Sequence, residues 1–357
     1  MAWVLPALQI APHWDRSHRA RRVFAALWLL LAVMAALSLA TGASGVSVPR
    51  LAADWLAGNS LPLREQVVLF DIRLPRLCMG ILVGAALAVS GALMQGLFRN
   101  PLADPGLVGV GAGASLGAVL AIVLGGALPA GLASLLSQHL VPFAAFLGSW
   151  IATLVLYAVS SRQGRTSVAT MLLAGIAFAS LAMAATGILI FVADDQQLRD
   201  LTFWGMGSLG GASWHKITVA APLILPILVL SPLLARGLNA LALGEAAALH
   251  AGVKVERLKT LTILCVAAAT GAAVAIAGGI GFIGIVVPHL LRLGTGPDHR
   301  FLLPNAALLG ASLLIGADII ARLIVAPAEL PIGIITALLG APVFLVILLR
   351  SRGMLDL

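Results

Sequence analysis

The chain has 357 residues, of which 61% are hydrophobic and only 10% charged, with a formal net charge of +8. Soluble domains carry about 25% charged residues and disordered chains lack apolar residues, so both classes are excluded. The composition predicts an all-α polytopic membrane protein, a single domain over 1–357 with no room for a soluble catalytic domain. In such a protein, excess positive charge indicates orientation in the membrane rather than nucleic-acid binding.

Ten apolar runs follow one another along the chain. The first follows a basic stretch, as in a signal peptide, but it is too long for that and is predicted to be an uncleaved span. The eighth is short and interrupted by Gly281, Gly284 and Pro288, which a helix enclosed by protein tolerates. The runs lie at 23–41, 77–97, 106–125, 141–159, 168–193, 215–235, 258–277, 280–291, 302–324 and 332–350.

An even number of spans places both termini on one side of the membrane. The connections on that side contain most of the lysine and arginine residues, so it is predicted to be cytoplasmic. The N-terminal segment 1–22 and the long connection 236–257 then lie in the cytoplasm. Residues 194–214 lie outside and are too short to span but too apolar for a free loop, which predicts a half-inserted helix.

Several motifs of soluble enzymes are missing. None of the lysines, Lys216, Lys254 and Lys259, follows a glycine, so the chain has no Walker A loop and is not itself an ATPase. Cys78 and Cys265 lie far apart in apolar runs and form neither a disulfide pattern nor a metal motif. The glycines at 109–117 lack the full phosphate-binding fingerprint and are predicted to pack helices.

One acidic residue lies in a predicted span near its outer end. Asp318 has Arg322 four residues further on, which favours a structural ion pair. The alternative is a carboxylate that binds a coupling ion in a gradient-driven transporter.

The predicted outer face carries histidine and tryptophan. His139 and His215 are expected to be solvated or interfacial, although contact with an iron centre stays open. Trp204 and Trp214 fit an interfacial aromatic belt, and a role in ligand contact stays open as well.

Longer motifs resemble the permease family of type II ABC importers, the FecCD family, which imports cobalamin, ferric siderophores and haem. The matching segments cover the chain from about residue 72 to its end. They are RLPR (Arg73–Arg76), Gly84–Gly117, MLLAGIAF (Met171–Phe178), ALGEAAALHAGV (Ala242–Val253), GGIGFIGIVVPHLLRL (Gly278–Leu293), Asp298–Leu314 and Glu329–Leu349.

The resemblance implies a bacterial inner-membrane subunit with ten spans. It also implies a homodimer with the pore on its two-fold axis, two cytoplasmic ATPase subunits that bind ATP-Mg, and a periplasmic binding protein, with no metal or cofactor permanently bound to the permease. The implied ATPase-coupling residues are Gly244, Glu245, Leu249 and Gly252. The implied docking residues for the binding protein are Arg73, Arg76 and Arg322.

The resemblance also implies that the fifth span and the outer half-helix line the translocation path. The residues concerned are Gly175, Ala179, Ala182, Ala185, Trp204, Met206 and Ser208. The segment Asp194–Gly211 is most similar to haem permeases, so haem is the expected substrate, with a ferric siderophore or cobalamin as the alternative. A membrane scaffold that transports nothing is a further alternative.

Overall fold

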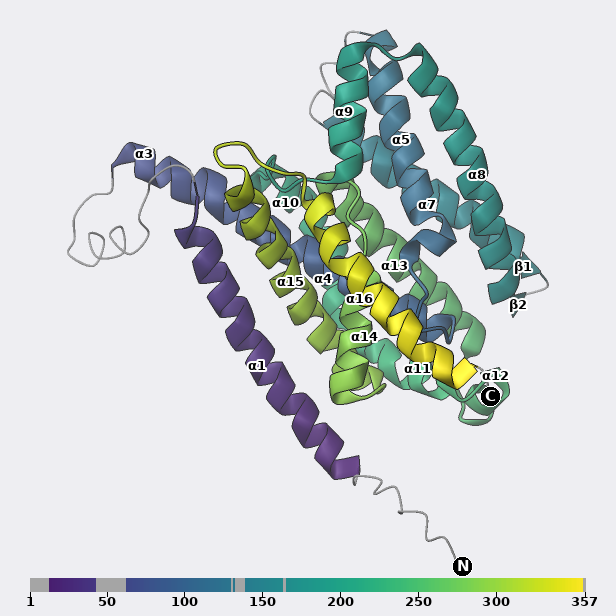
Figure 1. Ribbon diagram of the computed structural model, residues 1–357. Coiled ribbons are helices and arrows are strands. Elements are labelled where there is room, and N and C mark those ends of the chain that lie inside the picture. Colours follow the sequence, from purple (N-terminus) through teal and green to yellow (C-terminus); the bar gives the residue numbers. More distant parts are fainter. Residues whose placement is uncertain (1–12, 43–61, 130, 132–138, 163–164, 356–357) are drawn as a thin grey trace, which may run out of the picture.

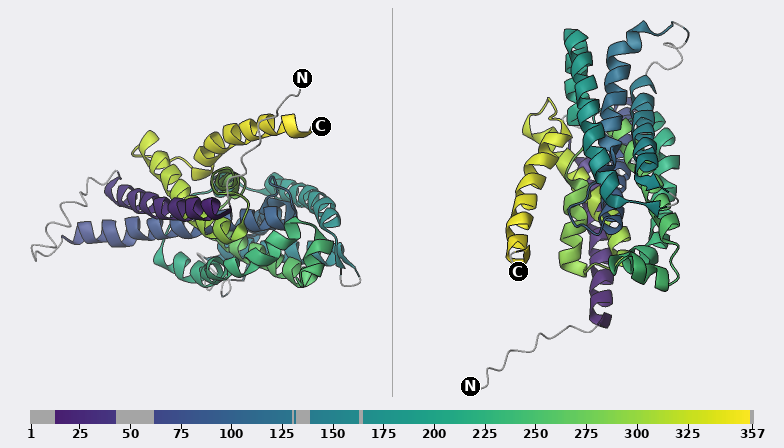
Figure 2. Two further views of the ribbon diagram at one scale, coloured as in Figure 1. Left: turned by 90° about the horizontal axis from the view of Figure 1, so that it is seen from below. Right: turned by 90° about the vertical axis from the view of Figure 1, so that its right-hand side faces the viewer.

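The computed structural model describes residues 13–42, 62–129, 131, 139–162 and 165–355. The long helices are α1 (His13–Ala40), α4 (Leu74–Leu97), α5 (Val110–Leu124), α7 (Leu140–Ser160), α8 (Val168–Val192), α10 (Trp214–Leu230), α13 (Val255–Ala277), α14 (Ile283–Thr295), α15 (His299–Ile324) and α16 (Ile332–Leu355). Shorter elements are α3 (Leu63–Gln66), α9 (Asp195–Met206), α11 (Ala235–Ala242), α12 (Glu245–His250) and the paired strands β1 (Ser161–Arg162) and β2 (Arg165–Thr166). Figure 2 shows the long helices running along a common direction, with α16 on one face of the bundle.

The helices match the ten predicted apolar runs. Among the described residues, eight helices are long and apolar enough to cross a membrane, and two shorter apolar helices, Ile283–Thr295 and Ile332–Val346, account for the remaining runs. The predicted all-α polytopic fold is therefore confirmed. The eighth run is short because the chain is not helical over 278–282 before α14 begins.

The second span begins earlier than the sequence predicted. One continuous helix runs from Leu63 to Leu97, through α3, a π-helical stretch η1 (Val67–Arg73) and α4. The prediction began this helix at residue 77 because Arg64, Arg73 and Arg76 interrupt the apolar pattern. The helix tolerates the last two because their buried guanidinium groups have partners: Arg76 pairs with Asp318, and Arg73 donates to the carbonyl oxygen of Leu39.

Helix α4 forms the centre of the bundle. Nearly all of its residues are buried, and it packs against α13, α14 and α15 (Figure 1). On one side of it, α5 and α7 approach each other through glycine: a Cβ atom at Gly113 would lie 2.3 Å from the carbonyl oxygen of Gly148. The predicted packing role is therefore confirmed for Gly113 and Gly117, whereas a Cβ atom at Gly111 would meet no atom within 4 Å.

Different short helices lie at the two ends of the bundle (Figure 1). The start of α1, the end of α16 and helix α12 lie at one end, called the α12 end here, and α9 lies at the opposite, α9 end (Figure 1). The helical ends of the chain thus share a side, as an even number of spans requires.

Candidate functional site

The predicted coupling segment contains a short helix, α12, that is anchored to the bundle. Lys259 Nζ on α13 lies 2.9 Å from Glu245 Oε1, at the first residue of α12. Leu249, on the same helix, is 60% exposed. The helix is therefore held to α13 at its first residue and exposes the apolar side chain of Leu249, as expected of a docking element.

Glycine bounds α12 on both sides. Gly244 has φ +111° and Gly252 has φ +81°, in the region of backbone space that strains residues with a Cβ atom. These turns separate α12 from α11 and α13. Of the four predicted coupling residues, Gly244 and Gly252 allow these turns of the backbone, Glu245 holds the helix to α13 and Leu249 is exposed. Contact with an ATPase stays a prediction.

A buried ion network lies at the α9 end. Arg76 Nη2 lies 2.9 Å from Asp318 Oδ1, and Arg322 Nε lies 3.1 Å from Asp318 Oδ2. Arg76 Nη1 also donates a hydrogen bond to Glu329 Oε1 at 2.7 Å. The predicted Asp318–Arg322 pair is confirmed. Because two guanidinium groups neutralise this carboxylate, it is not an unpaired acid of the kind that binds a coupling ion.

The three arginines implied to dock a binding protein lie inside the subunit. Arg73 and Arg76 are buried, and the Arg322 side chain is 8% exposed. Their guanidinium groups pair with groups of the same subunit rather than with solvent. Docking of a binding protein on these residues stays a prediction.

Two of these arginines also hold the end of α1. Arg73 Nη1 donates to the carbonyl oxygen of Leu39, and Arg322 Nη1 donates to that of Thr41 at 3.2 Å. The last carbonyl groups of a helix lack partners within the helix and carry partial negative charge, which guanidinium groups satisfy. The cluster therefore joins α1, α4 and α15.

Within residues 194–214, the predicted half-inserted helix, the structure has helix α9 over Asp195–Met206 only. Insertion into the membrane stays a prediction. The sequence explains the start of the helix. Asp194 accepts a hydrogen bond from Gln197 N at 2.8 Å, and Gln197 Oε1 accepts one from Asp194 N at 3.1 Å. This reciprocal capping box satisfies backbone donors that the first helical turn leaves unpaired.

The end of α9 forms a junction with two other connections. Ser208 N donates to Ala277 O at 2.8 Å, and Ile332 N donates to Gly207 O at 3.0 Å. Gly279 N donates to Trp204 O at 3.3 Å. The C-terminal end of α9, the irregular segment after α13 and the start of α16 are thus joined by backbone hydrogen bonds.

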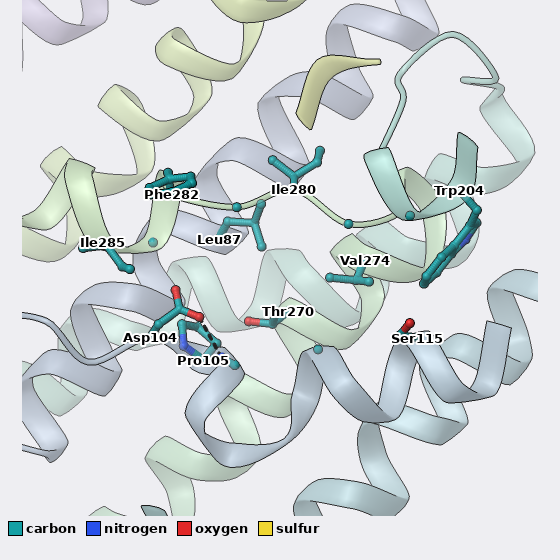
Figure 3. A pocket seen from close by; sticks show the side chains of 16 residues that line it. Leu87, Asp104, Pro105, Ser115, Trp204, Thr270, Val274, Ile280, Phe282 and Ile285 are labelled. Atoms are coloured by element: carbon teal, nitrogen blue, oxygen red, sulfur yellow. Dashed lines mark hydrogen bonds between the residues drawn. The ribbon is translucent and has the colours of Figure 1, made fainter. Parts of the chain in front are cut away.

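A cavity of about 550 Å³ lies below this junction, between α4, α5, α9, α13 and α14. Figure 3 shows Asp104 and Trp204 at opposite ends of it, with Ile280 and Phe282 along one side. Trp204 also lines a second cavity, of about 400 Å³, together with Ser208. These two residues of the predicted path therefore border cavities.

Asp104 is a polar group of this cavity that the sequence analysis did not single out. Its Oδ1 accepts a hydrogen bond from Gly106 N at 2.8 Å, and burial raises the pKa of its carboxyl group. Asp104 lies in the connection between α4 and α5, and nothing in its local sequence indicates that this connection returns to the interior.

The small residues predicted on the fifth span pack within the subunit. Gly175 and Ala182 are buried, and Ala179 and Ala185 are half-buried, on a helix that packs against α5 and α7. Met206 contributes its carbonyl oxygen, which a Cβ atom at Gly333 would approach to 2.2 Å. Contact of these residues with a substrate stays a prediction.

The outer histidines lie together. The rings of His139 and His215 have centroids 4.4 Å apart and border an apolar pocket of about 230 Å³ between α7, α10 and α13. In the part of the chain that the structure describes, no three His, Cys, Asp or Glu side chains are grouped as metal ligands. Cys78 and Cys265 are free thiols.

Comparison with known proteins agrees with this architecture. The FecCD transport family model matches residues 30–350. The chain is 52% identical over 282 residues to the hemin transport system permease protein HmuU of Yersinia pestis, covering 79% of this chain and 83% of that protein. It is 42% identical over 340 residues to the vitamin B12 import system permease protein BtuC of Klebsiella pneumoniae subsp. pneumoniae, covering 95% and 96%.

A solved structure has the same fold. A metal-chelate type ABC transporter in an inward-facing conformation superimposes with a TM-score of 0.81 at 32% sequence identity, over 92% of this chain and 99% of that chain. Because the family model spans most of the chain and these relatives align over most of their own length, this multi-pass membrane protein belongs to the FecCD transport family and is a permease subunit of an ABC importer.

Proposed function

We propose that this permease moves haem from the periplasm to the cytoplasm across the bacterial inner membrane, with both termini and α12 on the cytoplasmic side. The observation that carries the choice of substrate is the 52% identity to a hemin transport permease. The similarity of Asp194–Gly211 to haem permeases supports the same substrate. The 42% identity to a vitamin B12 permease keeps cobalamin as the second candidate, with ferric siderophores as the third.

The proposed assembly is a homodimer with two ATPase subunits and a periplasmic haem-binding protein. An ATPase partner is required because the sequence has no Walker A loop of its own. The outward face of α8 leaves room for a second copy: Leu173, Leu181 and Met183 are each about 70% exposed and need an apolar covering, which either lipid or protein provides.

Growth on a single iron source tests the substrate. An iron-starved strain that lacks its own haem and siderophore permeases is complemented with this gene and its partner genes, and we expect rescue by haem. Rescue by a ferric siderophore alone would contradict the haem proposal while leaving the family and the fold intact. Uptake of labelled cobalamin in the same strain tests the second candidate.

Docking of the ATPase is tested at Leu249. Replacing Leu249 with aspartate is expected to weaken binding of the ATPase subunits by about tenfold or more, because an apolar anchor becomes a charge that must be desolvated. Leu249→Met preserves the apolar contact and is expected to bind normally. Binding measured by co-purification and by titration in nanodiscs distinguishes the two, and equal binding by Leu249→Asp would remove α12 from the interface.

A further inference from the structure

A single buried lysine joins three elements at the α12 end. The Lys259 side chain is 2% exposed. Its Nζ lies 2.9 Å from Glu245 Oε1 on α12 and 3.1 Å from Glu256 Oε1 on α13. The same ammonium group donates a hydrogen bond to the carbonyl oxygen of Thr166, in β2, at 3.0 Å. All three hydrogens of the ammonium group therefore have an acceptor, and each acceptor lies on a different element.

The contact with β2 is reinforced by a second hydrogen bond. Thr166 N donates to Glu256 Oε2 at 2.8 Å, so the peptide groups at Thr166 are held by both members of the Lys259–Glu256 pair. Helix α7 is joined nearby, where the hydroxyl groups of Tyr157 and Thr260 lie 2.7 Å apart. Strand β2 is thus held to α13 by both of the hydrogen bonds at Thr166.

Strand β2 leads directly into α8. Ser167 follows Thr166 and is the N-cap of α8, where its side chain accepts a hydrogen bond from Thr170 N at 3.2 Å. Displacement of Thr166 therefore moves the first turn of α8. Helix α12, in contrast, reaches this region through the Glu245 carboxylate, which is 46% exposed.

We propose that Lys259 is a positioning residue that transmits displacement of α12 to β2 and to the start of α8. The inference rests on the proposed docking of an ATPase at α12 and adds the route by which its movement enters the membrane helices. Because a buried ammonium group strongly resists separation from its acceptors, α12, α13 and β2 move as one unit while the cluster is intact. Of the three contacts that Lys259 makes, the one with Glu245 is the one that links α12 to α13 and β2.

The test uses the full transporter, with its ATPase subunits and substrate-loaded binding protein, in proteoliposomes. Glu245→Gln removes the charge that α12 contributes and leaves the Lys259–Glu256–Thr166 contacts in place. We expect a roughly fivefold fall in substrate transported per ATP hydrolysed, the effect of losing a partly exposed ion pair. Thermal unfolding is expected to stay near that of the unchanged protein, and ATPase binding is measured in parallel so that the ratio is compared at equal ATPase occupancy.

Two further variants separate positioning from folding. Lys259→Arg keeps a cation and is expected to retain most of the transport per ATP. Lys259→Met removes it, and combining it with Glu245→Gln is expected to add no further loss, because both changes break the same link. If Lys259→Met fails to fold, the amount of substrate transported per ATP hydrolysed by Glu245→Gln is by itself the test of the proposal.

An unchanged ratio of transport to ATP hydrolysis in Glu245→Gln would overturn the proposed role of Lys259. The Leu249→Asp variant distinguishes this from failure of the proposed function. If that variant loses the ATPase while Glu245→Gln couples normally, α12 docks the ATPase but Lys259 does not transmit its movement. If neither change has an effect, the docking assignment itself is wrong.

Discussion

Replacing Asp318 with asparagine is expected to lower the free energy of unfolding by about 3–5 kcal/mol, because two guanidinium groups lose the buried carboxylate between them. Asp318 is 2% exposed, and its oxygens lie 2.9 Å from Arg76 Nη2 and 3.1 Å from Arg322 Nε. Asparagine has the same shape, so the loss reflects charge rather than packing. Thermal unfolding of the purified variant in nanodiscs measures it.

Glu329 provides the matched control. It pairs with the same Arg76, at 2.7 Å, but its side chain is 42% exposed. Replacing Glu329 with glutamine is expected to cost about 1 kcal/mol or less, since water replaces much of the lost interaction. Equal destabilisation by the two variants would show that burial does not set the strength of this network.

The sequence predicted the fold well because a lipid environment allows few alternatives. Every backbone polar group must be satisfied within a span, so long apolar runs form helices. The exceptions follow from charge. The predicted run began only after Arg73 and Arg76, yet the helix extends back through both of them, because their partners come from elsewhere in the chain. Asp318 is 242 residues from Arg76, a separation at which no local pattern operates.

In the candidate sites, too, contacts between residues close in the sequence were predictable and contacts between distant residues were not. Contacts between near neighbours were predictable, such as the Asp318–Arg322 pair four residues apart and the helical start after Asp194. The contact of Lys259 with Thr166 was not, because it depends on how α7, α8 and α13 pack. Asp104 was missed for the same reason. The resemblance located α12, but only the structure reveals that Glu245 is an anchor.

The junction at the end of α9 requires glycine at position 207. Gly207 has φ +69° and ψ +141°, a conformation close to one that only glycine adopts readily. A Cβ atom there would lie 2.5 Å from the carbonyl oxygen of Gly279. Gly207 O also accepts the hydrogen bond from Ile332 N at 3.0 Å, so any shift of the backbone disturbs the start of α16.

Replacing Gly207 with alanine is therefore expected to cost about 2–4 kcal/mol, from backbone strain and overpacking together. Transport is expected to fall below a tenth of its original rate, because α9, the segment after α13 and α16 lose their fixed relation. Gly205→Ala is the control: it lies two residues earlier, within α9, and a Cβ atom there meets no atom within 4 Å. Thermal unfolding and uptake are compared for both variants in the same membranes. If Gly207→Ala unfolds at the temperature of Gly205→Ala and still transports, the junction tolerates a side chain and α9 is not held in the way its hydrogen bonds indicate.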